Sequence, residues 1–109
     1  MPTYRASDTK FATVTLTNPN PVSLPVTVSI KIGNDGTASK TRTITPNGSA
    51  DFKMAVKMPS DAGAYQVTVP VKYNGASVTY KAGSIQIYKL QEPTISFDWG
   101  TIGGGGEVE

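Results

Sequence analysis

The side chains that most often perform catalysis or bind metals are scarce in this sequence of 109 residues. It contains no histidine, the commonest general base and metal ligand, and no cysteine for a disulfide or a zinc–thiolate site. Hydrolysis by paired carboxylates needs two acids that converge in one pocket. The acids up to residue 89 are Asp8, Asp35, Asp51 and Asp61. Asp35 and Asp61 lie in turn-forming stretches, where we expect them to make local hydrogen bonds.

Other reactive combinations are also incomplete. A serine or threonine nucleophile would need lysine as its base, and the many Ser and Thr residues are typical of solvated strand faces. Asn34 and Asp35 supply too few ligands for calcium, which takes about six to eight oxygen atoms. The run Gly103 to Gly106 does not join a strand to a helix, so we interpret it as a flexible spacer rather than a phosphate loop. We therefore predict no enzyme, no catalytic or metal-binding residue and no cofactor.

Apolar residues recur at every second position along most of the chain, which indicates β-strands with one solvated face. No segment has a helical period. The expected strands are Lys10 to Asn18, Val26 to Ile32, Thr37 to Ile44, Ala50 to Met58, Tyr65 to Tyr73, a segment with Val78 and Tyr80, and a segment after Gly83 with Ile85 and Ile87. Turn residues such as Asn34-Asp35-Gly36 and Asn74-Gly75 separate them. Seven or eight short strands predict an all-β, antiparallel sandwich.

The pattern also predicts details of this sandwich. Thr37 to Ile44 has few apolar residues and carries Lys40 and Arg42, so we expect an edge strand. Pro70 lies inside a strand that should be central, and it lacks the N–H that a central strand donates. The pairing must therefore be bulged or open at Pro70. The predicted core residues are Val14, Leu16, Val28, Ile30, Phe52, Met54, Val67 and Val69.

The stretch Asp61-Ala62-Gly63-Ala64-Tyr65 has the form of a tyrosine corner. We expect Asp61, Gly63 and Tyr65 to be structural, with the Tyr65 hydroxyl bonded to a backbone group between Met58 and Asp61. The stretch resembles the Asp-x-Gly-x-Tyr-x-Cys signature of intermediate-set immunoglobulin domains, with valine in place of cysteine.

A second resemblance covers residues 45–65. This segment is similar to cysteine-free sandwich domains appended to α-galactosidases and surface proteins of bacteria and archaea, which look like fibronectin type III modules. We favour this second family because the cysteine and the core tryptophan of the immunoglobulin pattern are both missing. Both resemblances imply an immunoglobulin-like fold with a spacer or adhesion role.

The C-terminal stretch from Thr94 to Ile102 stands apart from these resemblances. It follows Glu92-Pro93 and alternates the apolar residues Ile95, Phe97 and Trp99, the last being the single tryptophan. We predict a sandwich domain over residues 1–92 and an extended arm over residues 93–109. Ile95, Phe97 and Trp99 would bind a protein partner or a neighbouring subunit by strand addition. The alternative is a last strand that completes the same core.

The predicted domain and the predicted arm also differ in net charge. Through Lys89 there are ten lysines and arginines against four aspartates, a formal +6, whereas Glu92, Asp98, Glu107 and Glu109 give the remainder −4. The cations are dispersed along strands, so we expect no nucleic-acid partner. No run approaches the roughly 18 apolar residues of a membrane span, and the first residues lack the apolar region of a secretory signal. We expect no membrane partner.

These observations favour a structural or adhesion module that acts by protein–protein contact in a repetitive assembly. A decoration or tail component of a phage or virus virion would fit. The alternative is a spacer or carbohydrate-proximal module of a secreted enzyme, cell-surface protein or S-layer protein. A virion or an extracellular, cell-surface location is therefore expected.

Overall fold

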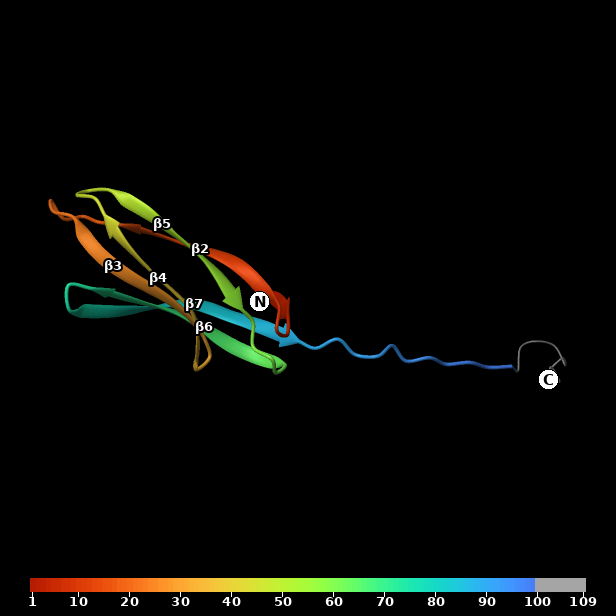
Figure 1. The fold of residues 1–109 in the computed structure, drawn as a ribbon. Helices are drawn as coiled ribbons and strands as arrows, with labels where there is room; N and C mark the ends of the chain where they lie inside the picture. Colours follow the sequence, from red (N-terminus) through yellow and green to blue (C-terminus); the bar gives the residue numbers. More distant parts are fainter. Residues whose placement is uncertain (100–109) are drawn as a thin grey trace.

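The computed structural model describes residues 1–99, and its regular structure consists entirely of β-strands (Figure 1). The described strands are β1 (Thr3–Arg5), β2 (Thr9–Thr17), β3 (Leu24–Ile32), β4 (Asp35–Ile44), β5 (Ser49–Lys57), β6 (Gly63–Tyr73) and β7 (Ala76–Tyr88). These strands confirm the all-β prediction. The prediction was possible because apolar and polar residues alternate along six of the strands. The three-residue strand β1 was not predicted, since Thr-Tyr-Arg is too short to show a period.

The strands form two packed sheets of unequal size. One sheet has the order β1-β7-β6-β3-β4, and the other contains β2 and β5. Successive strands change sheets between β1 and β2, between β2 and β3, between β4 and β5, and between β5 and β6, as in an immunoglobulin-like sandwich. All pairs are antiparallel except β1 with β7, where Thr3 lies beside Gln86 in a parallel ladder. The expected antiparallel pairing therefore holds for every described pair except β1 with β7.

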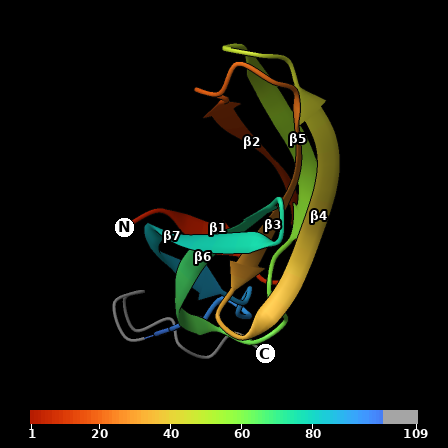
Figure 2. The ribbon, with the colours of Figure 1, turned by 90° about the vertical axis from the view of Figure 1, so that its left-hand side faces the viewer.

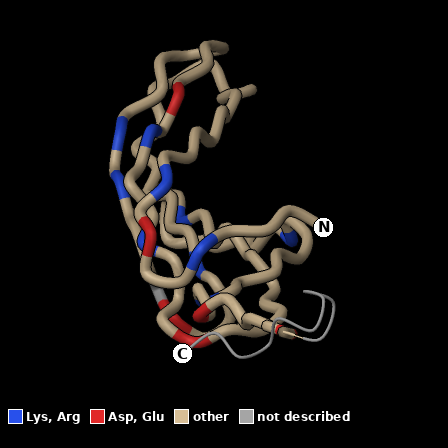
Figure 3. The backbone as a smooth tube through the Cα atoms, turned by 90° about the vertical axis from the view of Figure 1, so that its right-hand side faces the viewer, with Lys and Arg blue, Asp and Glu red and all other residues tan. Residues whose placement is uncertain are grey.

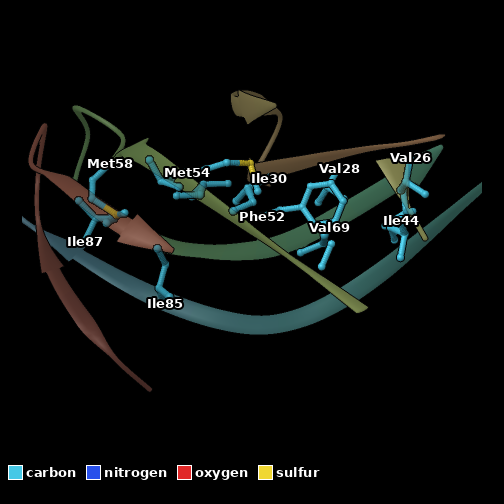
Figure 4. Packing of buried hydrophobic residues seen from close by; sticks show 14 residues of the cluster. Val26, Val28, Ile30, Ile44, Phe52, Met54, Met58, Val69, Ile85 and Ile87 are labelled. Atoms are coloured by element: carbon cyan, nitrogen blue, oxygen red, sulfur yellow. The ribbon is translucent and has the colours of Figure 1, made fainter. Parts of the chain in front are cut away.

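The core lies between the sheets, where side chains of β5 face those of β3, β6 and β7 (Figure 4). Phe52 is fully buried at its centre. Of the eight predicted core residues, five are buried: Val28, Ile30, Phe52, Met54 and Val69. The other three, Val14, Leu16 and Val67, are only half-buried and pack against the cluster from its side. Predicting them as buried was wrong, because two strands cover only part of a five-stranded sheet.

Pairing between the central strands β6 and β3 is interrupted at Pro70. Val71 pairs with Val28 and Thr68 with Lys31, in the same register on both sides of the gap. The N–H of Gly33 donates to the carbonyl of Gln66 at 2.8 Å in that register. Because bonded pairs alternate in an antiparallel ladder, Pro70 stands where an N–H would face Ser29. The sheet is therefore open at this point, and no bulge is needed in this ladder.

Strand β4 forms one edge of the larger sheet, as predicted. Lys40 and Arg42 pair with buried residues of β3, so they lie on the side of β4 that faces the second sheet. The Arg42 guanidinium crosses to β5 and donates to the carbonyl of Asp51 at 2.6 Å. This contact joins the two sheets along their β4–β5 side.

A buried asparagine fixes the loops at one end of the sandwich. Asn18 is completely buried, and its side-chain amide donates to the carbonyls of Val22, Ile44 and Thr45. Its side-chain oxygen accepts hydrogen bonds from the backbone and side chain of Asn20. The β2–β3 and β4–β5 connections are thus linked by this side chain, together with a backbone hydrogen bond from Asn47 to the carbonyl of Asn20.

Candidate protein-interaction site

The chain continues past β7 as an extended arm. No strand is formed from residue 89 to residue 99, and this segment leaves the sandwich in the direction of β7 (Figure 1). Ile95 is 89% exposed, Phe97 67% and Trp99 45%. The rings of Phe97 and Trp99 meet edge to face with centroids 4.7 Å apart. The apolar residues predicted to bind a partner therefore lie outside the core of their own domain.

An apolar groove opens between the two sheets on the side opposite Arg42. Its volume is about 470 Å³, and every strand except β4 contributes to its lining. Tyr4, Ala12 and Val14 line it as half-buried residues, and Val56, Val69 and Ile85 line it as buried ones. Seen along the sandwich, β2 stands apart from β1 and β7 at this opening (Figure 2). The groove exists because no described strand covers the far side of β2.

Strand β2 also has a free hydrogen-bonding edge beside this groove. The N–H of Met58 donates to Asp8 at 2.7 Å, and the N–H of Asn18 donates to Gly48 at 2.8 Å. Since bonded pairs alternate, the even-numbered residues of β2 bond to β5 and the odd-numbered residues point their N–H and C=O groups away. Thr13 lies in the middle of this outward-pointing set. Among the described strands, only β5 pairs with β2.

The predicted corner residues lie outside the groove, at the start of β6. The Tyr65 hydroxyl donates to the carbonyl of Asp61 at 2.9 Å, and Gly63 has a φ of 147°. The ring of Tyr65 packs over Gly33, where an added Cβ would lie 3.0 Å from the ring. The Asp61 carboxylate is 3.8 Å from Lys89 Nζ, but both side chains are exposed, so this ion pair contributes little to stability.

The remaining polar residues serve local contacts. The Asp51 carboxylate accepts a hydrogen bond of 2.7 Å from Thr15, its neighbour across the β2–β5 ladder. Residues 1–99 contain no group of three or more Asp and Glu side chains that could together hold a metal ion. Lysines and arginines are distributed over several strands along the length of the sandwich (Figure 3).

Sequence reasoning did not predict the groove. Lining residues such as Ala12 and Val14 have the alternation of ordinary core residues, and nothing in that pattern shows that a covering strand is absent. Within residues 1–99 there is no helix that could cross a membrane. The glycine run of residues 103–106, interpreted as a spacer, lies outside the described residues.

No protein-family model and no curated protein matches the sequence. Among solved structures, the chain is similar to SSP-19, an MSP-domain protein like family member in Caenorhabditis elegans. The two share 17% identity with a TM-score of 0.37, over 79% of this chain and 88% of that one.

Proposed function

We propose that this chain is a non-catalytic structural module that docks on a protein partner or neighbouring subunit through its C-terminal arm. The observation that carries the proposal is the exposure of Ile95, Phe97 and Trp99 beyond the last strand. An extended segment with three large apolar side chains on alternate positions is suited to bind by strand addition. Such a patch in water is typical of an interaction site.

A repetitive assembly is the setting that best fits this proposal. Each copy would carry both an arm with a formal charge of −4 and a body of +6, so copies attract one another. A decoration or tail component of a virion, or a subunit of a cell-surface layer, would use the arm in this way. A carbohydrate-proximal module would instead need aromatic side chains grouped on one face, and Tyr4 is half-buried while Trp99 lies on the arm.

The test compares the full chain with a chain that ends at Leu90. All seven strands and every core residue lie at or before Tyr88, so we expect the shortened chain to stay folded. Thermal unfolding should give similar midpoints, whereas sedimentation should show that only the full chain assembles. A full-length variant with Thr94→Ala and Ser96→Ala, on the polar face of the arm, is the matched control and should still assemble. Unfolding of the shortened chain, or a full-length monomer with buried Trp99, would contradict the proposal.

A further inference from the structure

We infer that the groove beside β2 is the receptor for the arm of a second copy of this chain, so that copies join head to tail. The inference rests on the proposed function, because it requires that the arm docks on a neighbouring subunit. It adds the place where the arm binds: between β2 and the pair β1–β7, as a third strand of the smaller sheet.

The free edge of β2 supplies the backbone half of this site. Five residues of β2 direct their N–H and C=O groups away from β5: Thr9, Phe11, Thr13, Thr15 and Thr17. An added strand would bond to these groups, as in other complexes formed by strand addition. Phe11, at this edge, is 84% exposed, and an added strand would cover part of its ring.

The groove supplies the side-chain contacts of this site. The even-numbered residues Ala12 and Val14 face inward but remain half-buried, and the lining around them is mostly apolar. In an added strand, Ile95, Phe97 and Trp99 all point to one face, because side chains alternate. Turned inward, these three side chains would fill the groove, while Thr94, Ser96 and Asp98 would lie beside the outward threonines of β2.

Length and charge agree with this occupant. Residues 94–99 span about 20 Å when extended at ~3.3 Å per residue, which matches the six-residue stretch of β2 from Lys10 to Thr15. Lys10 lines one end of the groove, and the arm carries the carboxylates of Glu92 and Asp98. The arm points away from its own sandwich, so an adjacent copy is the one that it meets (Figure 1).

A proline at position 13 tests the groove while leaving the arm unchanged. Thr13→Pro removes an outward N–H and leaves the β2–β5 hydrogen bonds intact, whereas Thr13→Ser retains the N–H and serves as the matched control. The arm is inactivated separately in a full-length chain with Ile95→Ser, Phe97→Ser and Trp99→Ser. Sedimentation should show assembly of the unmodified chain and of Thr13→Ser, and monomers for the other two variants.

Mixing the two monomeric variants completes the test. The Thr13→Pro chain keeps an arm and the triple variant keeps a groove, so we expect a one-to-one heterodimer. The triple variant contains no tryptophan, so fluorescence reports only Trp99 of the arm donor, and its emission should shift to the blue on mixing. Raising the salt concentration should weaken the heterodimer only partly, because the apolar contact is not screened.

Other outcomes separate the two proposals. If Thr13→Pro folds and assembles like the unmodified chain, the groove is not the receptor, although docking by the arm stands. If the triple variant assembles normally, both proposals fail. If the unmodified chain is a monomer with buried Trp99, the arm folds into its own groove and exchange between copies is excluded.

Should Thr13→Pro fail to fold, cysteine pairs in the cysteine-free chain provide the same test. Thr13→Cys on one copy should form a disulfide with a cysteine at Thr94, Ser96 or Asp98 on another. Thr43→Cys, on the exposed edge strand β4, is the control and should not cross-link. Equal cross-linking at positions 13 and 43 would overturn the inference.

Discussion

Arg42 on β4 donates a hydrogen bond of 2.6 Å to the carbonyl of Asp51 on β5, and this contact closes one side of the sandwich. On the opposite side, between β2 and β7, residues 1–99 form no comparable link, and the sandwich opens into the apolar groove. The two sides therefore differ in whether their outward backbone groups can bond to an added strand. A charged side chain satisfies the outward carbonyl of β5, whereas the outward groups of β2 are available to another strand.

Replacing Arg42 should remove the hydrogen bond between β4 and β5 and so lower the stability of the sandwich. We expect Arg42→Ala to lower the free energy of unfolding by about 0.5–1.5 kcal/mol, the usual net value of one hydrogen bond. Lys40→Ala, on the same face of β4, is the control and should have a smaller effect. Denaturant midpoints of the two variants provide the measurement, and equal midpoints would show that the contact adds no stability.

Removing the hydroxyl of Tyr65 tests the corner. Tyr65→Phe keeps the ring over Gly33 and loses the hydrogen bond to Asp61, so stability should fall by about 0.5–1.5 kcal/mol. Tyr80→Phe removes a hydroxyl from an exposed tyrosine and should leave the midpoint unchanged. A Tyr65→Phe midpoint equal to that of the unmodified chain would argue against a structural corner.

Asn18 should be the most sensitive polar residue of the sandwich. Asn18→Ala leaves the carbonyls of Val22, Ile44 and Thr45 without this donor. We expect a loss of about 2–4 kcal/mol, since each buried group left unpaired costs about 1–3 kcal/mol. Asn20→Ala removes only the side-chain hydrogen bond to the Asn18 oxygen and keeps the backbone one, so it should cost less. Equal losses in the two variants, measured by chemical denaturation, would refute the central role of Asn18.

Pro70 can be tested by restoring the missing donor. In Pro70→Thr the new N–H would face Ser29 and complete the β3–β6 ladder, because the register is the same on both sides of the gap. We expect the amide at position 70 to exchange slowly with solvent. Stability should change little, since a gain of about 1 kcal/mol from the bond is offset by a more flexible unfolded chain. A rapidly exchanging amide would mean that the strands stay apart for another reason.

The sequence by itself determined six of the seven described strands, the edge position of β4 and the break at Pro70. These features are local, because alternation, proline chemistry and turn residues act within a few positions of the chain. The tertiary structure decided the parallel pairing of β1, the burial of Asn18 and the groove beside β2. Each of these depends on which distant segments become neighbours. Val14 has the same alternation as Phe52, yet only Phe52 is fully buried, because sheet size and strand order decide which inward side chains are covered.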